Sequence, residues 1–156
     1  MAARTRWLDD DEQRAWRAFL VAAQLVDAAL DRQLQRDAGM PHAYYGILTG
    51  LVEAGTDGVR MSELAERLRF SPSRLAHAMG KLEANGWVRR RACPDDGRGQ
   101  AAHITAAGKR VQAAAAPGHV AEVRARVFDH LSAEQVAQLA AICTAIVGGP
   151  TSPDVA

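Results

Sequence analysis

Residues 89–105, RRRACPDDGRGQAAHIT, contain the side chains that come closest to a catalytic or metal-binding set. Two adjacent aspartates and a histidine can act as metal ligands or as an acid–base pair. Their spacing suits neither role, because His103 lies on a predicted strand beyond the loop and no third ligand recurs nearby. Asp95 and Asp96 also point to opposite sides of an extended chain. We therefore expect no enzyme activity, no metal and no cofactor.

Arginine is more frequent than aspartate in the same stretch, and this excess of positive charge favours contact with a polyanion. Residues 60–110 contain eleven Lys and Arg against five Asp and Glu, a net charge of +6, whereas the rest of the chain contains eight against thirteen, a net charge of −5. Neutralising phosphates requires local rather than total positive charge. This distribution indicates nucleic-acid binding, although an ordinary solvated basic face has the same composition.

A helix with two different faces precedes these arginines. Ser71 is its predicted N-cap and Pro72 occupies the first helical position. An apolar back, a basic front and an exposed first turn that includes Ser73 are typical of the recognition helix of a helix-turn-helix. The apolar side carries Leu75, Ala78, Met79 and Leu82, and the other side carries Arg74, His77 and Lys81.

Short elements on both sides complete the predicted module. A short helix with Ser62 as its cap comes before the FSPS turn, and Asn85 and Gly86 end the recognition helix. The period then changes to alternation, so that WVRRRA and QAAHIT predict two strands joined by the loop CPDDGRG, with Arg98 near its tip. Two helices followed by a β-hairpin predict a winged helix.

Longer helices are expected on both sides of this module. Residues 9–37 begin with acidic residues and carry an apolar stripe longer than a core of this size needs, so part of it is expected to meet a second chain. Residues 40–55 predict another helix. A helix from Thr105 is expected to kink or restart at Pro117, and Ser132 is the predicted cap of the last helix. The predicted fold class is mainly α with a small β-hairpin wing.

The sequence predicts no membrane segment, zinc site or disulfide framework. Its apolar runs are shorter than the roughly 18 to 20 residues that span a bilayer, and MAARTRWLDDDEQ lacks the apolar core of a signal peptide. Cys93 and Cys143 are far apart and show no CxxC spacing. We expect a cytoplasmic protein with two free thiols and no membrane contact.

The run MSELAERLRFSPSRLAHAMGKLEANGWVRRRACPDDGRGQAAHITAAGKRV resembles the MarR family of winged-helix transcriptional regulators. Its most specific parts are LE..GWV at the end of the recognition helix, Asp-x-Arg in the wing and I-T-x-x-G at the start of the next helix. The resemblance implies a single domain, and the composition of the final residues, GGPTSPDVA, predicts a disordered tail. The implied ranges are 1–148 for the domain, 9–37 and 118–147 for dimerisation helices, 58–108 for the DNA-binding region and 149–156 for the tail.

The resemblance also implies a function. It implies a homodimer that places two winged helices over a palindromic operator in double-stranded DNA, represses transcription, and releases DNA when a small aromatic or phenolic effector binds. Arg74 and His77 stand where many relatives have threonine and arginine, so the bases read do not follow from those relatives. The matching recognition-helix positions are Ser71, Ser73, Arg74, His77 and Lys81, and Arg98 matches the minor-groove arginine of the wing.

Side-chain chemistry divides the expected DNA contacts into base readers and phosphate anchors. Arg74 and Ser73 are the predicted readers, because arginine makes bidentate contacts to guanine O6 and N7, and His77 is expected at a base or a phosphate. Arg98 is expected to recognise a narrow minor groove. The predicted phosphate contacts are Lys81 and those of Arg89, Arg90 and Arg91 that face the DNA backbone. Asp95 and Asp96 either pair with a wing arginine or simply form the turn.

An effector site is expected near the ends of the first two helices. Trp16, His42, Tyr44 and Tyr45 have the aromatic bodies and polar tips to stack on an aromatic acid and hydrogen-bond it. Core packing explains the same four residues as well.

Two alternative functions remain open from the sequence. The winged helix can serve as a protein-interaction module with no operator, although its arginine excess favours DNA. A cysteine-based redox sensor is the other alternative, and it has less support, because the oxidant-sensing relatives carry their cysteine near the N-terminus. Neither Cys93 nor Cys143 matches that position.

Overall fold

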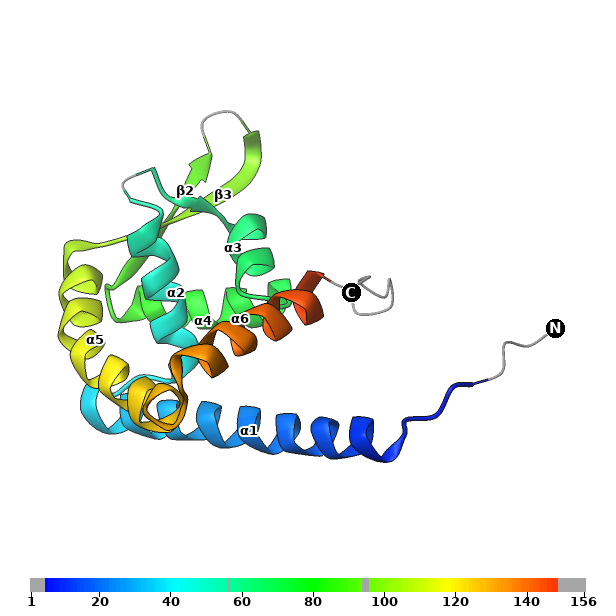
Figure 1. Ribbon diagram of the computed structural model, residues 1–156. Coiled ribbons are helices and arrows are strands. Elements are labelled where there is room, and N and C mark those ends of the chain that lie inside the picture. Colours follow the sequence, from blue (N-terminus) through cyan, green and yellow to red (C-terminus); the bar gives the residue numbers. More distant parts are fainter. Residues whose placement is uncertain (1–4, 56, 94–95, 149–156) are drawn as a thin grey trace.

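A computed structural model describes residues 5–55, 57–93 and 96–148, with the side chains of all of these except 96–98. The chain forms a helical body from which a β-hairpin projects (Figure 1). The elements are α1 Asp10–Ala38, α2 His42–Glu53, β1 Val59–Arg60, α3 Met61–Arg67, α4 Pro72–Ala84, β2 Val88–Cys93, β3 Asp96–Ile104, α5 Ala106–Arg126, the 3-10 turn η1 Phe128–His130, and α6 Ala133–Gly148.

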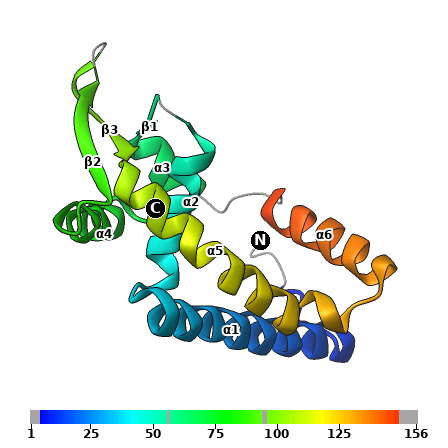
Figure 2. The ribbon, with the colours of Figure 1, turned by 90° about the vertical axis from the view of Figure 1, so that its left-hand side faces the viewer.

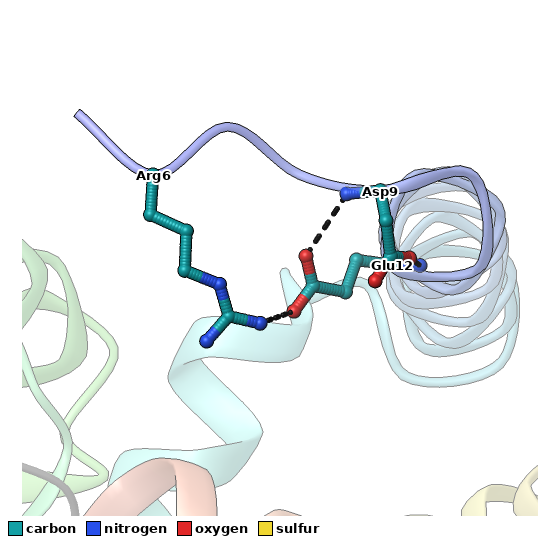
Figure 3. A network of polar contacts seen from close by, with 3 residues as sticks. All are labelled: Arg6, Asp9 and Glu12. Atoms are coloured by element: carbon teal, nitrogen blue, oxygen red, sulfur yellow. Dashed lines mark hydrogen bonds and ion pairs between the residues drawn. The ribbon is translucent and has the colours of Figure 1, made fainter.

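The long helix α1 is fixed at both ends. The side chain of Asp9 accepts a hydrogen bond from the backbone N–H of Glu12 at 2.8 Å, and the Glu12 carboxylate accepts one from the N–H of Asp9 at 3.0 Å. Arg6 pairs with the same carboxylate at 2.7 Å (Figure 3). Gly39, at φ +63°, ends the helix in the left-handed conformation. The observed bounds agree closely with the predicted 9–37.

The core lies between α2, α3, α4 and one face of the sheet, and the C-terminal part of α1 and α5 close it. The strands are antiparallel in the order β1-β3-β2. The two-residue strand β1 is too short to carry an alternation pattern and was not predicted. The largest fully buried side chains are Leu34, Met40, Ile47, Leu48, Leu51, Leu64, Leu75, Met79 and Leu82.

Two predicted helix boundaries are wrong. Arg60, not Ser62, occupies the N-cap position of α3, and it makes no side-chain capping bond, because the β1 strand runs directly into the helix. The helix after Thr105 does not break at Pro117 but continues to Arg126. Proline costs a helix interior about 3 kcal/mol, and packing of α5 along α1 offsets this cost. The expected dimerisation segment 118–147 is therefore the second half of α5, η1 and α6.

Two apolar faces lie open in the single chain. No residue of α6 is buried, and the buried residues of α1 begin only at Ala29. Ile142 and Ile146 of α6 are 57% and 59% exposed, and Leu25 of α1 is 63% exposed. Figure 2 shows α6 apart from the winged helix, at the other side of the molecule from α4.

Hydropathy does not mark any single helix of the described residues as able to span a membrane. Only α5 and α6 taken together reach the required length and composition, and the chain bends by 106° between them.

Candidate nucleic-acid interface

The turn between α3 and α4 is set by hydrogen bonds at both helix ends. Arg69 N–H donates to the carbonyl of Glu66 at 3.1 Å, and Phe70 N–H donates to the carbonyl of Ala65 at 2.9 Å. This is the Schellman pattern of a helix C-terminus, and Arg69 takes its left-handed position at φ +53°. Ser71 then caps α4, because its Oγ accepts the N–H of Arg74 at 3.2 Å. The predicted helix-turn-helix is confirmed.

The front of α4 presents polar and basic side chains to solvent. All five residues predicted there are exposed, namely Ser71, Ser73, Arg74, His77 and Lys81. The predicted apolar back is buried, namely Leu75, Ala78, Met79 and Leu82. Within the described part of the chain, no ion pair involves Arg74, His77 or Lys81, so their donors are available to an external partner.

Arg74 has an aromatic neighbour that the sequence analysis did not identify. The Cζ atom of its guanidinium lies 4.2 Å from the centroid of the Phe70 ring, well within the range of a cation–π contact. Phe70 is half-buried and packs against the core. Its spacing of four residues from Arg74 was the available signal.

The wing has two chemically different faces. Val88 and Ile104 pair across β2 and β3 and are buried in the core, and Arg90 pairs with Ala102 on the same side of the sheet. Alternation places Arg89, Arg91 and His103 on the opposite side. The predicted pair of strands is confirmed, and the three consecutive arginines do not share a surface.

Arg90 is bound to the end of the recognition helix. The Glu83 carboxylate accepts the Arg90 backbone N–H at 2.9 Å, Nε–H at 3.0 Å and an Nη2–H at 2.6 Å. The hydrogen bonds from the guanidinium lower the pKa of Glu83 despite its partial desolvation, and those to Glu83 raise the pKa of Arg90. This pair fixes the orientation of β2 relative to α4. Glu83 was not among the predicted site residues, because its partner lies across a turn.

The tip of the wing is described only in part. Arg98 and Asp96 belong to β3, whose backbone pairs Asp96 with Cys93 across the hairpin. The strand thus extends further into the predicted loop CPDDGRG than its glycines suggested. The side chains of Asp96 and Arg98, and the whole of Asp95, lie outside the described residues.

The base of the wing is anchored to α5. Thr105 Oγ1 donates to the carbonyl oxygen of Gly86 at 2.7 Å and accepts the N–H of Gly108 at 3.0 Å. A Cβ atom at Gly108 would collide with the carbonyl oxygen of Trp87. Glycine at this position therefore permits the close approach of α5 to the end of the recognition module.

A pocket of about 310 Å³ lies between α2, α3 and α5, next to the winged helix. Of the predicted effector residues, His42 and Tyr45 line it, whereas Tyr44 packs against the core and Trp16 stacks on Phe19 in the open part of α1. Trp16 is therefore not brought to His42 within one chain. The other lining residues are Gly46, Thr49, Gly50, Glu53, Leu64, Arg67, Leu68 and His119.

His119 of α5 is the principal pocket residue missing from the sequence analysis. Its ring centroid lies 4.4 Å from that of Tyr45 and 5.4 Å from that of His42. Burial lowers the pKa of His119, and the nearby His42 lowers it further. His42 Nδ1 lies 3.0 Å from Asp27 Oδ1. The buried Nδ1 of His119 has no hydrogen-bond partner among the described residues, and only the tertiary fold brings these groups together.

The two cysteines differ in their exposure to solvent. Cys93 is buried at the end of β2 and Cys143 is exposed on α6. Over the described ranges, no group of three or more His, Cys, Asp or Glu side chains is arranged to bind a metal ion.

Comparison with known proteins gives family matches at both the sequence and the structure level. Residues 38–99 match the MarR family model. Sco3205 of Streptomyces coelicolor, a MarR family transcriptional regulator solved in complex with DNA, is 49% identical with a TM-score of 0.91, over 96% of this chain and 94% of its own. AbsC, a MarR family transcriptional regulator of the same organism, is 38% identical with a TM-score of 0.86, over 92% and 96%.

More distant proteins share the fold alone. CouR of Rhodococcus jostii RHA1, solved with p-coumaroyl-CoA, is 22% identical with a TM-score of 0.77, over 95% of this chain and 99% of its own. No curated protein sequence matches the chain. The identity to Sco3205 extends over nearly the whole of both chains, and this chain has a winged helix whose α4 presents a basic, exposed front. The chain therefore belongs to the MarR family of DNA-binding transcriptional regulators.

Proposed function

We propose that this chain is a ligand-responsive repressor that binds a pseudo-palindromic operator as a homodimer. The observation that carries the proposal is the exposed front of α4. Arg74, His77 and Lys81 share that front, and their side chains form no ion pair among the described residues. A DNA duplex supplies the acceptors that these donors lack. The guanine edges in its major groove suit arginine, and the phosphates of its backbone suit lysine.

The open faces of α1 and α6 support the homodimer. Each presents large apolar side chains, with Phe19 at 47% and Leu25 at 63% exposure on α1, and Ile142 and Ile146 on α6. Contiguous apolar surface of this kind marks an interface. A two-fold dimer over these faces places two α4 helices on half-sites about ten base pairs, or about 34 Å, apart.

The wing arginines divide into three roles in this proposal. Arg90 orients the wing through Glu83 and is not a main phosphate contact, since its guanidinium is already paired. Arg89 and Arg91 are exposed on the other face of the sheet and act as phosphate anchors beside the groove. Arg98 enters the minor groove, which leaves the wing aspartates to shape the loop.

The pocket lined by His42, Tyr45 and His119 is the proposed effector site. The two histidine rings and Tyr45 offer aromatic faces, and Arg67 on α3, whose guanidinium is paired with Glu63 at 2.5 Å, would exchange that partner for a ligand carboxylate. A buried nitrogen without a partner, such as Nδ1 of His119, costs free energy that a ligand's hydrogen bond removes. The lining comes from α3, which belongs to the DNA-binding region, and from α5, whose second half belongs to the proposed dimerisation segment. A bound ligand therefore contacts both regions.

Selection of bound duplexes from a random library tests the function directly. The wild-type protein is expected to enrich a motif with two inverted half-sites whose centres are about ten base pairs apart. Affinity for this motif should exceed that for unrelated DNA by about a thousandfold or more at the same salt concentration. Failure to enrich any motif, with equal affinity for all duplexes, would contradict an operator-binding role and favour a protein-interaction module.

A further inference from the structure

Phe70 occupies a place from which it cannot readily move. Its backbone N–H is bound to Ala65 at the end of α3, and the next two residues, Ser71 and Pro72, are the cap and first position of α4. Its ring is half-buried against the core cluster. Both helices of the DNA-binding module therefore fix the position of the ring.

The contact with Arg74 uses one part of the guanidinium and leaves another part available. The Cζ atom of Arg74 lies over the ring, 4.2 Å from its centroid, and the guanidinium N–H donors lie in the plane of their own group. Those in-plane donors form the fork that recognises O6 and N7 of guanine. The contact with Phe70 therefore restricts the side chain, and no hydrogen bond or ion pair with another described residue occupies the donors that read a base.

We propose that Phe70 is a positioning residue for base recognition, which holds the guanidinium of Arg74 in a restricted orientation before DNA binds. The inference rests on the proposed operator-binding function and names a residue that determines its specificity. An unrestrained arginine has to lose rotamer freedom on binding, whereas a stacked one has already lost part of it. A restricted fork also tolerates fewer wrong base pairs.

The test compares Phe70→Leu, which removes the ring, with Phe70→Tyr, which keeps it. Each protein is titrated with the selected operator, with every single-base-pair variant of one half-site, and with unrelated DNA. Phe70→Leu is expected to reduce discrimination at one or two adjacent base pairs by about two- to fivefold, as expected for an exposed cation–π contact. Phe70→Tyr should keep the wild-type discrimination, and binding to unrelated DNA should be the same for all three proteins.

An Arg74→Ala background separates positioning from general structural damage. If Phe70 acts through Arg74, Phe70→Leu has no further effect on discrimination once Arg74 is alanine. An equal loss in both backgrounds, or an equal loss on all duplexes, would overturn the inference. Specific binding by the wild type together with unchanged discrimination by Phe70→Leu would also overturn it, whereas absence of specific binding by the wild type would contradict the proposed function itself.

A second measurement needs neither DNA nor a folded variant. In the wild-type protein, side-chain protons of Arg74 above the Phe70 ring should show upfield ring-current shifts and nuclear Overhauser contacts to the ring by NMR. Arg74 resonances at random-coil positions, without such contacts, would overturn the inference whatever the operator results.

Discussion

Arg69 adopts a backbone conformation that favours glycine. Its φ of +53° places it at the left-handed position of the Schellman stop, where the two hydrogen bonds to Ala65 and Glu66 hold the turn. The left-handed conformation raises the free energy of a residue that has a Cβ atom by roughly 1–2 kcal/mol. The turn of the DNA-binding module thus contains local strain that the surrounding caps maintain.

Replacing Arg69 by glycine is expected to stabilise the protein. Relief of the Cβ clash exceeds the greater backbone entropy of glycine in the unfolded chain, for a net gain of about 0.5–1 kcal/mol in the free energy of unfolding. Urea denaturation of the wild type, Arg69→Gly and Arg69→Ala measures this. Arg69→Ala keeps the strain and should leave the stability close to that of the wild type, so equal stability of the two variants would contradict the explanation.

The Glu83–Arg90 pair makes a pH-dependent contribution to stability. Because the folded chain lowers the pKa of Glu83, the contribution is present above the unfolded carboxyl pKa of about 4.3 and is lost as pH falls through the lower folded pKa. Glu83→Gln is expected to cost about 1 kcal/mol at pH 7, since the side chains are partly exposed. Denaturation of both proteins from pH 7 to pH 3 should show this difference shrinking below about pH 4.5; a difference independent of pH would rule out the carboxylate as its source.

At this scale the sequence reveals capping residues better than it reveals partners. Ser71 and Pro72 follow local rules and were predicted correctly. Glu83 and His119 were missed because their partners depend on how β2 and α5 pack, which no spacing rule encodes. The DNA-contact roles of the exposed α4 residues and of Arg98 remain predictions.

Among elements, the joint between the recognition module and α5 is closely packed. Gly108 lies against the Trp87 carbonyl, and Thr105 bridges to the same turn. These contacts attach the start of α5 to the base of the wing. The pocket residue His119 lies on this helix, so the proposed effector site and the wing are connected through one element.

Gly108→Ala is expected to disturb this joint. The added methyl group collides with backbone rather than with a movable side chain, so the free energy of unfolding should fall by about 1–3 kcal/mol. Gly80→Ala is the matched control, because a Cβ at this helical glycine of α4 meets nothing within 4 Å and should stabilise the protein by about 0.5–1 kcal/mol. Thermal unfolding of both variants measures the contrast; stabilisation by both substitutions would contradict the close approach.

Element prediction succeeded where periodicity extends over several turns and failed where packing overrides local preference. The first helix, the recognition helix and the Ser132 cap of α6, whose Oγ accepts the Gln135 N–H at 3.2 Å, were predicted correctly. The continuation of α5 through Pro117 was not, because the prediction took no account of the packing of α5 against α1. No local signal distinguishes that case from a broken helix.

For the whole molecule, the apolar faces of α1 and α6 determine the expected assembly. Ile142→Glu places a charge on the open face of α6, which the proposed dimer buries, and should weaken dimerisation by about 3 kcal/mol or more. Sedimentation analysis across concentrations measures this. Val52→Glu changes an exposed apolar residue of α2 outside the two faces and should leave the assembly unchanged. A dimer unaffected by Ile142→Glu would place the interface elsewhere.

The apolar stripe of residues 9–37 already indicated a surface beyond the needs of one core, but its partner is not encoded in periodicity. The charge asymmetry likewise located the basic region without separating the exposed Arg89 and Arg91 from Arg90, which is paired with Glu83. Fold and family could therefore be predicted from the sequence. Which charged residues pair with each other and which face solvent could be seen only in the packed structure.

The most direct test of DNA recognition by a two-fold dimer is to change the rotation of one half-site relative to the other about the DNA axis. Five base pairs inserted between the half-sites of the selected operator rotate one of them by about half a turn relative to the other. Quantitative binding of the wild-type protein to the original and lengthened operators is then compared at one salt concentration. Two α4 helices held in one dimer predict that affinity falls to that of a single half-site; full affinity for the lengthened operator would contradict this mode of recognition.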